Sequence, residues 1–111
     1  GDILLIGTAQ CIRQAFDSIG DCFRFGGDEF VVLTGKISEE AIQDALVILQ
    51  EKMEQYNRMH EHKLSLAAGY ALAQKTEDAS FKSLFRQADA MMYENKRKIH
   101  QNTAKQHSDN A

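Results

Sequence analysis

The chain has 111 residues, of which 43% are hydrophobic, which is enough for one compact domain with a core and is unlike a disordered composition. The formal net charge is −3 and no basic stripe is present, which disfavours nucleic-acid binding. No apolar run reaches bilayer-spanning length, no signal peptide is expected, and two cysteines without metal-ligand spacing, Cys11 and Cys22, indicate a reducing compartment.

A first amphipathic helix is predicted over residues 3–19. Its apolar residues recur at helical spacing and are Leu5, Ala9, Ile12, Phe16 and Ile19. Asp2 stands directly before this run, where a carboxylate can cap free backbone N–H groups. Gly20-Asp21 is expected to end the helix and turn the chain.

A β-hairpin is predicted next, with strands at residues 22–25 and 30–34. Gly26 and Gly27 supply the positive-φ conformations of a tight turn. The turn is followed at once by Asp28 and Glu29, whose adjacent carboxylates repel each other unless a cation lies between them. Oxygen ligands favour a hard cation such as Mg²⁺. The alternative is an ordinary hairpin whose two acids are simply solvated.

The second half of the chain is predicted to contain two more helices and a strand. Ser38 caps a helix that runs to about residue 59. Large apolar and small residues alternate over 64–72, which predicts a strand closely covered by a helix or another backbone. A third helix is predicted from Ser80 to Lys98, and residues 100–111 are expected to form a polar, disordered tail.

The order helix, strand, strand, helix, strand, helix predicts an α+β fold with helices packed on an antiparallel-rich sheet. Three strands under three helices make a thin sheet, so a further strand before residue 1 is suspected.

Four stretches resemble one known family. Arg24-Phe25-Gly26-Gly27-Asp28-Glu29-Phe30 looks like the defining motif of the GGDEF family, the bacterial diguanylate cyclases. Gly1-Asp2-Ile3-Leu4-Leu5 is similar to the family's segment before that motif. The stretch from Ala88 to Lys96 is similar to the family's Ala-Asp-x-Ala-Met-Tyr-x-Ala-Lys, and Leu64–Ala71 resembles its Ser-x-Gly strand with Ala67 in place of Ser.

The resemblance implies a nucleotide-cyclase-like, ferredoxin-like sheet and the condensation of two GTP into cyclic di-GMP with release of pyrophosphate. Asp28 and Glu29 are then the catalytic and metal-binding residues, for two Mg²⁺ per site, with Mn²⁺ as a substitute. Asp2 would bind guanine, Gly26 and Gly27 the phosphates by their backbone, and Lys96 the phosphates by its charge. The residues themselves also allow simpler roles. Asp2 could cap the first helix, and Lys96 could be a surface charge near a helix end.

The sequence departs from the family pattern at three places. The resemblance starts partway through the domain, so that residues 1–99 are expected to be an N-terminally incomplete GGDEF domain, inactive alone for lack of the first metal-binding Asp. His100 stands where the family usually has Arg. Asp17 and Gly20 occupy the positions of the family's Arg-x-x-Asp inhibitory site, so no site of that kind is expected.

By the same resemblance, catalysis requires a homodimer of such domains, brought together in the full protein by an N-terminal sensor or regulatory domain. A cytoplasmic location is expected, without direct membrane contact from this segment; any membrane anchor would belong to other domains of the full protein. The alternative function is a catalytically inactive GGDEF domain that binds GTP or another protein as a regulatory module.

Overall fold

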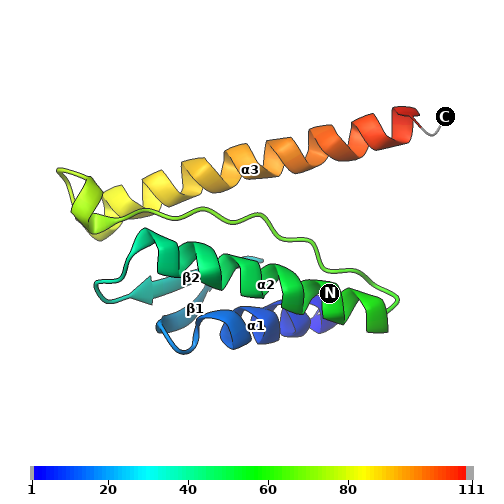
Figure 1. The fold of residues 1–111 in the computed structure, drawn as a ribbon, viewed down its shortest axis with the longest axis horizontal. Helices are drawn as coiled ribbons and strands as arrows, with labels where there is room; N and C mark the ends of the chain where they lie inside the picture. The colour runs from blue at the N-terminus through cyan, green and yellow to red at the C-terminus, as the bar shows by residue number, and fades with distance from the viewer. Residues whose placement is uncertain (1, 110–111) are drawn as a thin grey trace. The chain divides into compact units, whose positions relative to one another are not determined.

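The computed structural model describes the backbone of residues 2–109 and the side chains of residues 3–99. Its elements are α1 (Asp2–Phe16), β1 (Gly20–Gly26), β2 (Glu29–Thr34), α2 (Glu39–Met59), the 3-10 helix η1 (Ala73–Lys75) and α3 (Phe81–Asp109) (Figure 1). The predicted α+β class is confirmed. The chain forms two compact units, residues 1–65 and 66–111. None of the helices in the described part of the chain combines the length and apolar character that crossing a membrane requires.

The core of the first unit lies between α1 and α2, which run side by side in Figure 1. Both helices bury one apolar face because their apolar residues recur every three or four positions. The buried side chains are Cys11, Ile12, Ala15, Phe16, Ile42, Ala45, Leu49, Met53 and Leu64. At Gly7 of α1, a Cβ atom would lie 2.8 Å from the ring of Tyr56 in α2, so the ring packs directly on the glycine.

The strands β1 and β2 form an antiparallel hairpin, as predicted. The register pairs Gly20 with Thr34 and Arg24 with Phe30, and then shifts so that Gly26 pairs with Glu29. Phe25 is therefore the extra residue of a β-bulge directly before the turn. A bulge increases the local twist and bends the strand, so the turn is re-aimed relative to the rest of the hairpin.

Side chains cap both ends of α2. At its start, the Ser38 hydroxyl accepts a hydrogen bond from the backbone N–H of Ala41 at 3.1 Å, which confirms the predicted cap. In its last turn, the Asn57 side chain donates to the Leu64 carbonyl at 3.0 Å and accepts from the Leu64 N–H at 2.7 Å. Lys63 Nζ donates to the His60 carbonyl at 2.7 Å, placing a positive charge at the negative end of the helix dipole.

The prediction of a strand over residues 64–72 is wrong. Residues 63–72 have no strand or helix assignment, and the described strands pair only as β1 with β2. Alternation of residue types predicts an extended backbone, but a strand also requires a neighbour that completes its hydrogen bonds. The ferredoxin-like arrangement of a larger sheet accordingly stays a prediction.

The close covering of this segment by a helix is confirmed within the second unit. A Cβ atom at Gly69 would lie 2.0 Å from the Ala88 carbonyl oxygen, so the segment contacts the backbone of α3 directly. The helix α3 continues past its predicted end at Lys98 to Asp109. The domain boundary at residue 99 and the disordered tail of residues 100–111 stay predictions, because the side chains from His100 on lie outside the described residues.

Candidate functional site

The turn of the hairpin consists of Gly27 and Asp28, between the paired residues Gly26 and Glu29. The φ angles are +159° at Gly26 and +21° at Gly27, values that residues with a side chain rarely adopt. A Cβ atom built on either glycine would have no neighbour within 4 Å. The backbone conformation, and not close packing, therefore explains why glycine occupies both positions. The space beside the two Cα atoms is open to a ligand.

Arg24 holds this turn from the end of β1. Its Nε and one terminal guanidinium nitrogen donate to the Gly27 carbonyl at 2.9 and 2.7 Å. Two donors on one oxygen restrict the turn more than a single bond would, because the guanidinium is a rigid planar fork. Sequence reasoning missed this role, although an arginine three residues before the second turn glycine was the available signal.

Asp28 lies in the turn and Glu29 is the first residue of β2, and both residues are exposed. The described residues contain no cluster of three or more His, Cys, Asp or Glu side chains that could hold a metal ion. Two neighbouring carboxylates nevertheless fit the donor set of Mg²⁺, which is commonly held by one or two carboxylates together with substrate phosphates and water. Asp28 and Glu29 thus carry the donor type that Mg²⁺ prefers, and their metal-binding role stays a prediction.

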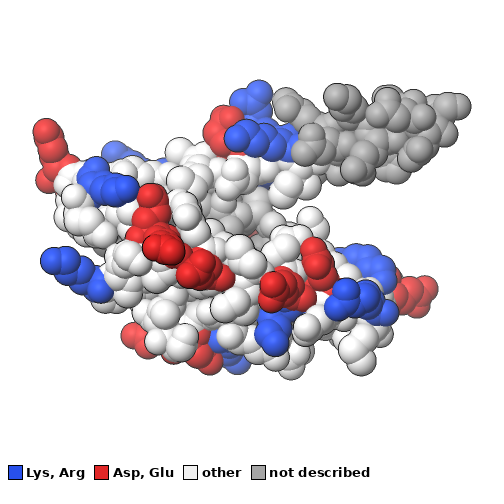
Figure 2. All heavy atoms as spheres, viewed as in Figure 1, with Lys and Arg blue, Asp and Glu red and all other residues white. Residues whose placement is uncertain are grey.

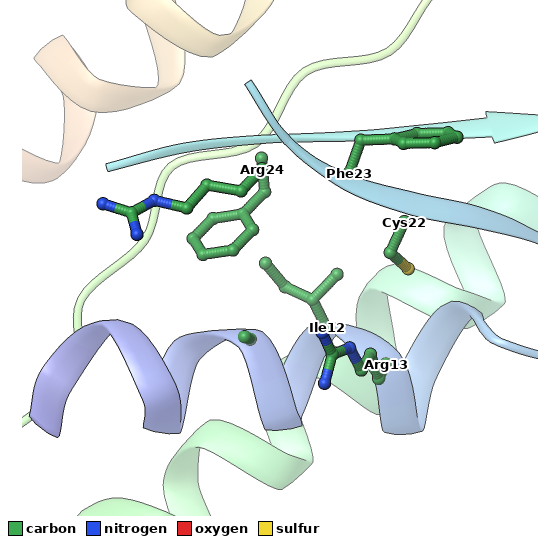
Figure 3. A pocket seen from close by; sticks show the side chains of 7 residues that line it. Ile12, Arg13, Cys22, Phe23 and Arg24 are labelled. Carbon is green, nitrogen blue, oxygen red and sulfur yellow. The ribbon is translucent and has the colours of Figure 1, made fainter. Parts of the chain in front are cut away.

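A cavity of about 40 Å³ lies between α1 and the hairpin. Figure 3 shows Ile12, Arg13, Cys22, Phe23 and Arg24 around it, and Ala9 and Phe30 complete its lining. This volume accommodates a water molecule and is far smaller than a pocket for a nucleotide. Partial burial, and next the nearby Asp17 carboxylate, raise the pKa of the Cys22 thiol, so it is a weak nucleophile. The cavity is therefore no candidate for a nucleotide site.

The other predicted site residues are placed separately. Lys96 lies on α3 in the second unit and is exposed. The ion pair described near it joins its neighbours Arg97 and Glu94, at 3.2 Å, and does not involve Lys96. Asp2 is the first residue of α1, whereas its side chain and that of His100 lie outside the described residues. The guanine-binding and capping roles of Asp2 both remain predictions.

Charged side chains of both signs are interspersed on the face shown in Figure 2. A protein that binds the phosphate backbone of a nucleic acid needs a continuous basic surface. The absence of a nucleic-acid partner, expected from the net charge of −3, stays a prediction.

Comparison with known proteins agrees with the geometry of the turn. The family model described as diguanylate cyclase, GGDEF domain, matches residues 1–102. Diguanylate cyclase DgcS of Shewanella oneidensis is 30% identical over an alignment of 99 residues that covers 86% of this chain and 31% of that protein. The chain thus spans about a third of the length of this curated relative. No solved structure matches this chain. The match over residues 1–102 shows that the chain belongs to the GGDEF family of diguanylate cyclase domains.

Proposed function

We propose that this chain is a catalytic GGDEF domain of a protein that condenses two GTP molecules into cyclic di-GMP and releases two pyrophosphates. The observation that carries the proposal is the glycine turn, which is open above Gly26 and Gly27 and bears the exposed pair Asp28 and Glu29. The relative from Shewanella, which is named as a diguanylate cyclase, supports the same reaction class.

In the proposed reaction, the 3′-hydroxyl of one GTP attacks the α-phosphorus of the other, opposite the leaving pyrophosphate. Asp28 accepts the hydroxyl proton and is the main carboxylate ligand of the metal site, with Glu29 as the second. The glycine backbone lets the phosphates approach the turn without steric conflict, because both positions lack neighbours within 4 Å of a Cβ atom. Bound Mg²⁺, two ions per site with Mn²⁺ as a substitute, would supply charge neutralisation of the triphosphate.

Two further residues are proposed to bind GTP. Asp2 would accept hydrogen bonds from the N1–H and N2–H₂ edge of guanine, since a carboxylate has two acceptor oxygens. Lys96 would bind the triphosphate through its ammonium group, which is exposed and lies outside the Arg97–Glu94 ion pair. The proposed protein works in the cytoplasm under the control of a sensor or regulatory domain.

Because each domain holds one GTP, the reaction joins substrates from two domains, and the proposed active form is a homodimer with its sites face to face. GTP and a second copy of the domain are therefore the proposed partners.

A second candidate function is GTP binding without turnover, in a regulatory module that contacts another protein. One observation favours it: position 100 carries His where the family usually has Arg, so one phosphate-binding charge is missing. The intact Gly26–Glu29 turn favours the enzyme.

One assay separates the two functions. The full-length protein is incubated with GTP and Mg²⁺, and cyclic di-GMP is measured alongside GTP binding. Formation of cyclic di-GMP is expected. Binding of GTP with no product at saturating Mg²⁺ would favour the regulatory module, and absence of both binding and product would contradict both functions.

A further inference from the structure

Asn95 makes a specific contact directly beside Lys96. Its side-chain Nδ2 donates to the backbone carbonyl of Ala68 at 2.6 Å, and both residues are half-buried. The bond joins the third helix to a segment 27 positions earlier in the chain, and both partners belong to the second unit. Lys96, the next residue, is exposed.

The surroundings of this bond are a direct contact between two backbones. A Cβ atom at Gly69 would lie 2.0 Å from the Ala88 carbonyl oxygen and 2.4 Å from the Met92 nitrogen. Ala88, Met92 and Asn95 are spaced by four and three residues, so they share one face of α3. The extended segment at Ala68 and Gly69 lies on this face.

Lys96 borders the packed face, because it follows Met92 by four residues and Asn95 by one. Where the side chain of Lys96 points therefore depends on how α3 is rotated and shifted against the extended segment. Glycine offers no side chain that would interlock with the helix and restrict such movement. The Asn95 bond does restrict it, because a hydrogen bond needs a defined distance and direction.

The presence of asparagine at position 95 of α3 needs an explanation other than helix formation. Asn is a poorer helix former than Ala, and the similar family motif has Ala where this chain has Asn95. Helix propensity therefore does not explain Asn95. The hydrogen bond does, since it satisfies a half-buried carbonyl that has no strand partner in the described residues.

We propose that Asn95 is a positioning residue for phosphate binding: its bond to the Ala68 carbonyl sets the rotation of α3 and thereby the direction of the Lys96 ammonium group. The proposal rests on the proposed function, in which Lys96 binds the triphosphate of GTP. Asn95 itself touches no substrate in this scheme.

The test is a double-mutant cycle in the full-length protein, measured as affinity for a non-hydrolysable GTP analogue and as KM and kcat with GTP. Asn95→Asp keeps the shape but turns a donor into an acceptor that repels the carbonyl, and we expect about tenfold weaker binding. Lys96→Ala is expected to weaken binding at least as much. In the Lys96→Ala background, Asn95→Asp should have no further effect, because its influence acts through Lys96.

Two further variants keep the test decisive. Asn95→Ala introduces a good helix former, and we expect binding about threefold weaker than wild type with KM affected more than kcat. Gln87→Ala is the matched control. Gln87 lies on the same helix and donates to Thr76 Oγ1 at 3.1 Å and Ser83 Oγ at 3.2 Å, but it is about two and a half turns away from Lys96. Its loss should leave GTP affinity unchanged.

Equal weakening by Asn95→Asp in the presence and absence of Lys96 would overturn the proposal, because the two residues would then act independently. Unchanged affinity in both Asn95 variants, with Lys96→Ala impaired, would overturn it while leaving the proposed function intact. Unchanged affinity in Lys96→Ala would instead overturn the role given to Lys96, and the positioning role with it.

Discussion

Glycine serves opposite purposes in two regions of this molecule. At the hairpin turn, Gly26 and Gly27 have positive φ angles and open space where a side chain would be. In the extended segment that packs on α3, Gly69 leaves no space for a side chain, since a Cβ atom would overlap the Ala88 carbonyl and the Met92 nitrogen. The first pair permits an unusual backbone, and the third glycine permits contact between two backbones.

The difference separates a region shaped for a ligand from a region shaped for packing. An open turn without packing neighbours contributes little to the core, so changes there should affect binding and catalysis more than stability. A backbone pressed against a helix is part of the packed interior, where added volume is destabilising. Four substitutions test this contrast, from the largest expected effect to the smallest.

Asp28→Asn should abolish cyclic di-GMP formation, with a loss of about a hundredfold or more, because a neutral amide is a poor metal ligand and proton acceptor. Stability should change by less than about 0.5 kcal/mol, since Asp28 is exposed. The measurements are product formation from GTP by the full-length protein and its thermal unfolding. Retained turnover would contradict the role of Asp28.

Gly69→Ala should destabilise the protein by about 3 kcal/mol or more, because the new methyl group would meet backbone atoms that have no freedom to rotate away. Thermal or denaturant unfolding measures the effect. The control is Ala71→Gly in the same segment, which removes a methyl group and adds none. A change below about 1 kcal/mol at Gly69 would show that segment and helix separate easily.

Gly27→Ala should cost about 1 kcal/mol, because the φ angle of +21° is unfavourable for alanine while space is available. The free energy of unfolding would be compared directly with that of Gly69→Ala. If both substitutions were equally destabilising, the contrast between an open and a packed glycine would be broken.

Arg24→Ala should have the smallest effect on stability, about 0.5 kcal/mol, because the bonds to the Gly27 carbonyl are exposed to solvent. Affinity for Mg²⁺ and GTP should fall more clearly, since the turn would lose the group that restricts it. Arg24→Lys keeps the charge but not the fork, and serves as the control. Unchanged affinity in both variants would mean that the turn holds its shape without Arg24.

Local signals predicted much of the first unit correctly. The helical spacing of apolar residues predicted α1 and α2, Ser38 predicted the start of α2, and the two glycines predicted the hairpin turn. These features depend on residues within a few positions of each other, so a sequence pattern is sufficient to reveal them. The predicted end of the first helix at residue 19 is wrong: α1 ends at Phe16, and Gly20 and Asp21, expected to turn the chain, are paired residues of β1. The bulge at Phe25 and the hydrogen bonds from Arg24 to the Gly27 carbonyl were not predicted, because both depend on the register of the two strands.

The sequence by itself determined the open glycine turn with its two carboxylates, because glycine conformation and the repulsion of adjacent charges are local properties. Only the tertiary structure decided the state of residues 64–72. Their alternating pattern specifies an extended backbone, but it leaves open whether strand neighbours or a helix will satisfy that backbone. The structure places α3 against it, with Gly69 on the helix backbone and Asn95 bonded to Ala68. Hydrogen bonds between residues far apart in sequence settle such alternatives, and no local pattern contains them.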